Sequence, residues 1–125
     1  MRTMRRAASS ILTACAAAAL AAPAGAHSFT GTTAGVWHYD EEAFKGRITA
    51  NVEECVSGRL VKLQGFNEDD EWETIARRRT GKHGRWRVVF EGADGTFRHV
   101  VRPTSEVTDE HEHECRRFVS GMMPL

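Results

Sequence analysis

The amino-acid sequence predicts an all-β fold, a small antiparallel β-sandwich of about seven short strands. Three features of the 125-residue chain support this prediction. Apolar and polar residues alternate over short segments, which is the period of a strand with one buried face. Glycine-containing turns separate these segments at fairly regular intervals. Beyond the first 26 residues no sustained 3.6-residue apolar pattern is present, so helices are not expected.

Three strands are expected in the first half of the domain. GRITANV (46–52) is rich in residues that favour strands. RLVKLQGF (59–66) places Val61 and Leu63 on one face and polar residues on the other. WETIARRRT (72–80) follows the polar loop NEDDE and ends at a glycine turn.

Three more strands are expected in the second half. RWRVVFE (85–91) alternates most regularly, so its tryptophan should be buried and the flanking arginines exposed. TFRHVVRP (96–103) follows an Asp-Gly turn and ends at a proline, which strands exclude from their interior. The polar stretch 104–114 is expected to be a loop that leads into the last strand, CRRFVSG (115–121). The predicted core consists of Ile48, Val61, Leu63, Trp86, Val88, Phe90, Phe97, Val101 and Phe118.

The beginning of the chain has the features of an export signal. Three arginines precede an apolar, alanine-rich run (11–22), and small residues around Ala26 form a cleavage motif. Cleavage there would make His27 the first residue of the mature chain. The alternative is the lipobox-like sequence LTAC (12–15), which would leave a lipid-anchored Cys15. The apolar run before that cysteine is short and continues past it, which favours cleavage after Ala26.

The expected organisation is a signal peptide (1–26), an N-terminal arm (27–45) and a β-sandwich domain (46–125). The small, polar residues 27–35 of the arm are expected to be loose, whereas VWHYDEEAF (36–44) contains three aromatic residues and could dock on the domain or start a strand. Removing the signal leaves 99 residues, with 14 Lys+Arg against 17 Asp+Glu and a formal net charge of −3. This length fits one domain. The charge gives no reason to expect a nucleic-acid partner, and no transmembrane segment is expected in the mature chain. The expected location is extracellular or periplasmic.

Two cysteines, Cys55 and Cys115, remain after signal removal. In an exported chain they are expected to pair. If successive strands run in opposite directions, both cysteines fall at the same end of the sandwich. The bridge would close a loop of about 60 residues, worth about 4 kcal/mol in the chain-entropy model.

The strand segments also carry a spaced pattern of glycine, aromatic, aliphatic and cysteine residues. Its members are Gly46, Ile48, Cys55, Arg59, Val61, Leu63, Thr80, Gly84, Trp86, Val88, Gly95, Phe97, Val101 and Cys115. This pattern resembles the transthyretin-like, or carboxypeptidase regulatory-like, β-sandwich domains of secreted bacterial proteins. The resemblance spans residues 46–121 and implies a binding, stalk or accessory role with no shared catalytic motif.

The sequence DEHEHEC (109–115) contains the first candidate site. On a strand, His111 and His113 would share a face and could hold Zn²⁺ or Cu²⁺, with neighbouring glutamates adding oxygen ligands. The competing interpretation, which we favour at this stage, is a solvated surface loop whose carboxylates neutralise nearby arginines.

His27 is a second candidate metal ligand. As a mature N-terminus it would offer both its α-amine and its imidazole to Cu²⁺, an arrangement similar to the histidine brace of copper proteins. The alternative is that a histidine follows the cleavage site by chance.

Two further charged clusters are candidate binding sites. A basic patch of Arg77, Arg78, Arg79, Arg85 and Arg87 could form a stripe across two paired strands and bind an acidic polymer or surface, or simply protect a solvated sheet edge. In the loop 67–73, Asp69, Asp70 and Glu71 could hold Ca²⁺ but lack the EF-hand spacing.

The sequence favours a secreted, disulfide-stapled, non-catalytic binding or accessory domain that engages a protein or an envelope polymer. No cofactor is expected. A Cu²⁺- or Zn²⁺-binding protein that uses His111 and His113, possibly with His27, is the alternative. A hydrolase is disfavoured because neither a G-x-S-x-G motif nor a recognisable nucleophile–base pair is present in the sequence.

Overall fold

The computed structural model describes residues 27–107 and 110–125, and in these residues the chain is an all-β sandwich. A short 3₁₀ turn, η1 (Glu53–Cys55), lies between β3 and β4. The strands are β1 (His27–Gly31), β2 (Thr33–Asp40), β3 (Ala43–Ala50), β4 (Leu60–Phe66), β5 (Trp72–Arg79), β6 (Arg85–Val89), β7 (Thr96–Val101), β8 (Thr104–Val107), β9 (His111–Cys115), β10 (Phe118–Val119) and β11 (Met123–Pro124).

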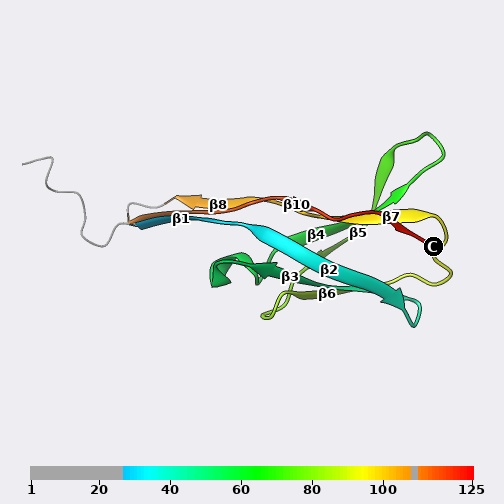
Figure 1. Ribbon diagram of the computed structural model, residues 1–125, viewed down its shortest axis with the longest axis horizontal. Helices are drawn as coiled ribbons and strands as arrows, with labels where there is room; N and C mark the ends of the chain where they lie inside the picture. The colour runs from blue at the N-terminus through cyan, green and yellow to red at the C-terminus, as the bar shows by residue number, and fades with distance from the viewer. Residues whose placement is uncertain (1–26, 108–109) are drawn as a thin grey trace, which may run out of the picture.

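The strands form three sheets (Figure 1). Sheet I has the order β2–β3–β6, and sheet II has the order β10–β7–β4–β5 with β11 also paired to β7. Sheet III has the order β1–β9–β8 and extends at the end of the molecule opposite the C-terminus. The strand pairs are antiparallel except β1 and β9, which run parallel.

The core lies between sheets I and II. Each of four strands contributes two alternating side chains, as expected for strands with one buried face. The predicted Phe90 and Phe118 are only partly buried at the margin of this cluster, and Phe44 is a core residue that alternation did not identify. The central cluster is Phe44, Ile48, Val61, Leu63, Trp86, Val88, Phe97 and Val101.

The predicted orientation of β6 is confirmed. Trp86 is only 4% exposed, whereas Arg85 and Arg87 are exposed. The inner position of Trp86 depends on its neighbour across the ladder, Gly46, because a Cβ at Gly46 would collide with the indole ring. The indole therefore occupies the space that a side chain on β3 would otherwise take.

The predicted disulfide between Cys55 and Cys115 is confirmed, with the two Cα atoms 5.4 Å apart. It joins η1 to the end of β9, so it ties sheet III to the connection that follows β3. Gly31 lies beside Cys115 in the β1–β9 ladder, and a Cβ there would collide with the sulfur of Cys55. Glycine at this position lets the bridge pack against β1.

Three expectations about the ends of the chain differ from the structure. Residues 27–35 of the N-terminal arm are not loose, because they form β1 and the start of β2, while residues 36–44 lie in β2 and β3 in agreement with the strand alternative. Within the stretch expected as a loop (104–114), residues Thr104–Val107 form β8 and His111 begins β9. The last predicted strand (115–121) is shorter than expected, because Cys115 ends β9 and only Phe118–Val119 form β10. The signal peptide (1–26), with the alternative lipid site Cys15, lies outside the described residues.

Candidate functional site

The outer face of sheet I collects basic side chains from strands that are far apart in the sequence. Side chains at directly paired positions of antiparallel strands lie side by side on the same face. The register of β3 with β2 and β6 therefore builds two rows across the sheet. One row is Val36, Arg47 and Arg85, and the other is His38, Lys45 and Arg87.

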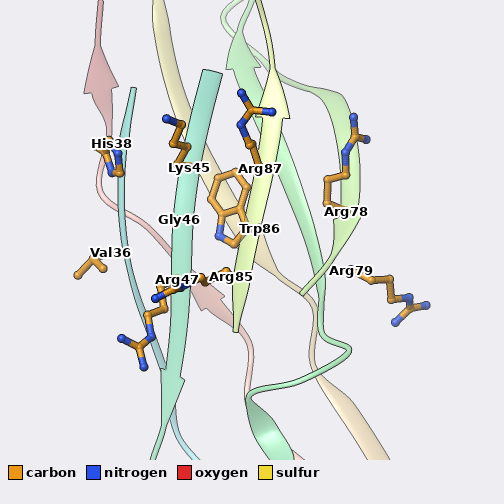
Figure 2. A pocket seen from close by; sticks show the side chains of 10 residues that line it. All are labelled: Val36, His38, Lys45, Gly46, Arg47, Arg78, Arg79, Arg85, Trp86 and Arg87. Carbon is orange, nitrogen blue, oxygen red and sulfur yellow. The ribbon is translucent and has the colours of Figure 1, made fainter. Parts of the chain in front are cut away.

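These two rows line an open groove of about 580 Å³ that continues to Arg78 and Arg79 on β5 (Figure 2). Of its lining side chains, six are Lys or Arg, one is His38 and none is a carboxylate. Figure 2 shows these cations arranged around the indole of Trp86, which lies between β3 and β6. The groove is therefore a local concentration of positive charge on a domain whose formal net charge is −3.

Of the Lys and Arg side chains in the two rows, only Lys45 forms an ion pair in the described part of the chain. Lys45 Nζ lies 2.9 Å from Asp40 Oδ1 and 3.3 Å from Glu41 Oε2. Its hydrogen bonds to these two carboxylates raise the pKa of the Lys45 ammonium, and the same contact lowers the pKa of the Asp40 carboxyl. Asp40 also lies 3.5 Å from His38 Nε2, so this end of the groove is partly neutralised.

Four arginines of the groove have no carboxylate within ion-pair distance among the described residues. Three of them, Arg47, Arg85 and Arg87, have no ion pair there. The fourth, Arg78, donates to the backbone carbonyl of Arg77 at 2.8 Å. Like charges at directly paired positions, as in Arg47 and Arg85, are destabilising in an antiparallel ladder. A bound anion would relieve this repulsion, and guanidinium groups are well suited to carboxylate and phosphate.

Arg98 on sheet II differs from these groove arginines, because its guanidinium contacts neighbouring side chains. Arg98 Nε on β7 donates to Gln64 Oε1 at 2.8 Å, and its guanidinium lies 4.3 Å from the ring centroid of Trp72. Both its edge and its face are therefore occupied by neighbouring side chains. Within the described part of the chain, the arginines of sheet I have no such side-chain partners, so they are the better candidates for binding a ligand.

The structure brings together four of the five arginines of the predicted basic patch. Arg78, Arg79, Arg85 and Arg87 meet in the groove, whereas Arg77 is not among its lining residues. The two strands are not paired as expected, because β5 is at the edge of sheet II and β6 is at the edge of sheet I. Lys45 and Arg47 were missed, since only the β3–β6 register shows that they lie beside Arg87 and Arg85.

The predicted histidine site falls on sheet III. His111 and His113 belong to β9 and not to a surface loop, and the first two alternate positions of β1 pair with them: His27 with His111, and Phe29 with His113. The His113 and Phe29 rings stack with centroids 4.1 Å apart. The side chains of His27 and His111 lie outside the described part of the structure. Among the residues whose side chains are described, no group of three or more His, Cys, Asp or Glu is arranged to hold a metal ion.

A smaller hollow of about 150 Å³ adjoins this histidine face. It is lined by Glu54 from η1, by Glu106 from β8 and by His113, together with neighbouring residues of the β8–β9 hairpin. The structure thus brings Glu54, the sequence neighbour of Cys55, and His113 to one hollow.

The candidate calcium loop has a different internal organisation. The side-chain oxygen of Asn67 accepts hydrogen bonds from the backbone N–H groups of Asp69 (2.9 Å) and Glu71 (3.0 Å). Asp70 adopts a left-handed backbone conformation, with φ of 59°. These contacts define a tight turn, and the carboxylates of Asp69, Asp70 and Glu71 do not form a described metal-binding group.

Comparisons of the chain with protein families, curated proteins and solved structures find no match. Within residues 27–107 and 110–125, no helix has the length and apolar character needed to cross a membrane.

Proposed function

We propose that this chain is an exported binding domain whose groove on sheet I holds an acidic polymer of the cell envelope. The observation that carries the proposal is the set of six Lys and Arg side chains around a 580 Å³ groove that no carboxylate lines. An anionic ligand is the partner whose charge complements this surface.

The spacing of the cations favours a chain-like ligand over a single small anion. Adjacent strands lie about 4.8 Å apart, and residues two apart on one strand are separated by roughly 6.7 Å. The rows that contain Arg47–Arg85 and Lys45–Arg87 therefore form a grid of cations. A polymer with regularly repeated phosphate or carboxylate groups can contact several points of such a grid at once, which adds avidity without deep burial.

The disulfide supports the proposed location. Structural disulfides persist in oxidising compartments, and Cys55–Cys115 staples the domain across 60 residues. An exported domain with a transthyretin-like role in binding or support would meet envelope polymers directly. This family assignment is part of the proposal and depends on the resemblance of residues 46–121.

The proposal is tested with a labelled linear polyanion, inorganic polyphosphate, titrated against the mature protein in fluorescence anisotropy. Polymer binding should weaken about tenfold or more in the double variant Arg47→Gln/Arg85→Gln, because two charge-assisted contacts are lost. Binding to the native protein should also weaken steeply as salt is raised from low to physiological ionic strength.

A matched control separates the groove from net charge. Arg77→Gln/Arg117→Gln removes the same number of charges at two exposed positions that do not line the groove. This control should change the polymer affinity less than about twofold, and both variants should retain the melting temperature of the native protein, as expected for surface substitutions. Equal weakening by both variants, or the absence of binding at low salt, would refute the groove as the site.

A further inference from the structure

We infer that a hollow at the end of the sandwich opposite the disulfide binds a small organic cation with a quaternary ammonium group, of the type of choline. The hollow has a volume of about 220 Å³ and lies between the β4–β5 hairpin, the turn before β7 and the start of β7, near the C-terminus (Figure 1). It shares no residue with the groove on sheet I and does not depend on the proposed polymer binding.

The strand register of sheet II opens this hollow. Gly65 on β4 is paired with Phe97 on one side and with Glu73 on the other. Because glycine has no side chain, the middle of this row is left open between a phenyl ring and a carboxylate. The register of β4 with β5 shifts after Leu63, which gives β5 one extra residue, Ile75. The end of the Ile75 side chain lies over Gly65, so that a Cβ at Gly65 would meet Ile75 Cδ1 at 2.9 Å.

Three phenylalanine side chains supply the aromatic lining. Phe97 is buried, and its ring packs edge to face against Phe90 with centroids 5.9 Å apart. The third ring, Phe66, is 45% exposed and completes the lining from the hairpin. The face of an aromatic ring attracts a cation, and cavities of several rings recognise quaternary ammonium groups in this way.

The charge of the hollow is opposite to that of the groove. Glu73 and Asp94 are its only charged lining residues, and both are exposed. Neither forms an ion pair among the residues the structure describes. A cationic ligand complements these two carboxylates as well as the rings.

The wall that carries Phe90 and Asp94 is held in place by both sheets. The backbone N–H of Gly95 donates to the carbonyl of Leu125 at 3.2 Å, and the N–H of Leu125 donates to the carbonyl of Gly95 at 2.7 Å. The hydroxyl of Tyr39 on sheet I donates to the carbonyl of Phe90 at 2.6 Å. A wall that is ordered before the ligand arrives lowers the entropic cost of binding.

The lining favours a quaternary over a primary ammonium group. A primary ammonium is strongly hydrated and has three N–H donors that need acceptors, which phenyl rings supply poorly. A quaternary ammonium has no N–H and presents methyl groups to the rings. A free cation is favoured over a phosphocholine head group, because the phosphate would be repelled by Glu73 and Asp94.

The test titrates choline chloride into the ¹⁵N-labelled, oxidised protein and follows the backbone amide resonances of Gly65 and Gly95. Both should shift and saturate with one affinity. Phe66→Leu keeps an apolar side chain but removes the ring, and it should weaken the affinity about two- to fivefold, as expected for one cation–π contact. Glu73→Gln/Asp94→Asn should weaken it about fivefold, because two carboxylates at exposed positions are lost.

A matched variant controls for local charge. Asp69→Asn/Asp70→Asn removes two carboxylates from the adjacent hairpin loop that do not line the hollow, and asparagine tolerates the positive φ of Asp70. This variant should change the choline affinity less than about twofold. The groove variant Arg47→Gln/Arg85→Gln should also bind choline like the native protein, so the two sites are tested separately.

Three further ligands test the chemical class. The neutral analogue 3,3-dimethyl-1-butanol, the primary amine ethanolamine and phosphocholine should each bind several-fold more weakly than choline. Equal binding of any one of them would refute, respectively, the role of charge, the preference for a quaternary group or the assignment to a free cation. Absence of saturable shifts at Gly65 and Gly95, or equal weakening by the Asp69→Asn/Asp70→Asn variant, would refute the hollow as the site.

Discussion

The disulfide end of the molecule and its aromatic centre each bury one basic side chain, and the surroundings of the two differ. At the disulfide end, Arg59 is 2% exposed and donates to four oxygens. At the centre, His99 is fully buried, and both of its ring nitrogens are without a hydrogen-bond partner among the described residues.

Arg59 connects segments that are distant in the sequence. Its Nη1 donates to the carbonyl of Cys55 at 2.7 Å and to Thr33 Oγ1 at 3.0 Å. Its Nη2 donates to the carbonyls of Arg102 and Arg116, each at 2.9 Å. Burial lowers the pKa of the guanidinium, but a group that ordinarily titrates above pH 12 stays charged at physiological pH. The guanidinium satisfies backbone carbonyls near the ends of several strands and so links these segments.

His99 is enclosed by aromatic rings. Its ring centroid lies 4.9 Å from that of Trp37, 5.1 Å from that of Trp86 and 5.7 Å from that of Phe118. Desolvation in this box lowers the pKa of His99 to about 4. The buried cation of Arg59 is therefore held by hydrogen bonds, whereas the buried imidazole of His99 is accommodated only in its neutral form. The two regions should therefore respond differently to mutation and to acid.

The largest effect is expected for Arg59→Ala. It leaves four oxygens without their donor, and hydrogen bonds to charged groups are worth about 1.5–3 kcal/mol each, so the unfolding free energy should fall by about 5 kcal/mol or more. Urea unfolding of the oxidised protein measures this loss, which should be similar at pH 7 and pH 5. A loss below about 1 kcal/mol would mean that the carbonyls find other donors and that Arg59 is not needed to link these segments.

The next effect is expected for Trp86→Ala, which should cost about 3–5 kcal/mol as a large-to-small change in the core. Arg85→Ala on the opposite face of the same strand should change the unfolding free energy by no more than about 0.5 kcal/mol. Thermal and urea unfolding of the two variants measure the contrast. If Trp86→Ala melts with the native protein, the aromatic box does not stabilise sheet I.

The smallest effect is a dependence on pH from His99. Its folded pKa of about 4 lies below the ordinary value of 6.5, so the unfolded chain binds more protons between these two values. Stability that is fully present above about pH 6.5 should be lost as the pH falls to about 4, by at most about 3 kcal/mol.

The urea midpoint measured at pH 7.5 and at pH 4.5 tests this expectation, with His99→Phe as the variant. The native protein should lose stability at the lower pH, and His99→Phe should lose much less, because it removes the titrating group while keeping an aromatic ring in the box. His83→Ala, at an exposed position, should behave like the native protein. The same acid sensitivity in His99→Phe would assign the effect to other groups and remove the distinction between the two regions.

Alternation in the sequence predicted the sandwich because each of its central strands has one buried face. Val61, Leu63, Trp86 and Val88 follow this rule and lie in the core. Strand β8 of sheet III does not follow it, since Thr104, Ser105, Glu106 and Val107 are all exposed. A strand without a buried face has no apolar period, so this stretch was expected to be a loop.

The candidate sites depend on which strands pair, and a two-residue period carries no information about pairing. Arg85 and Arg87 could be identified from their own segment, but Lys45 and Arg47 join them only through the β3–β6 register. The proximity of His27 to His111 likewise follows from a parallel pair between distant strands. Arg59 and His99 were not foreseen as buried, because both residue types are usually at least partly exposed and their burial depends on the neighbours that surround them.

The parallel pairing of β1 with β9 also determines when the fold can be completed. During synthesis the segment His27–Gly31 emerges long before its partner His111–Cys115. Contacts of such high sequence separation close late and slow folding, because the loop entropy must be overcome first. Until then β1 presents an unpaired edge, and Cys115 has not yet reached Cys55. The oxidation state of the Cys55–Cys115 pair would therefore report the last step of folding. A chaperone would act on the unpaired β1 of the nascent chain, and a thiol oxidase would act on these two cysteines.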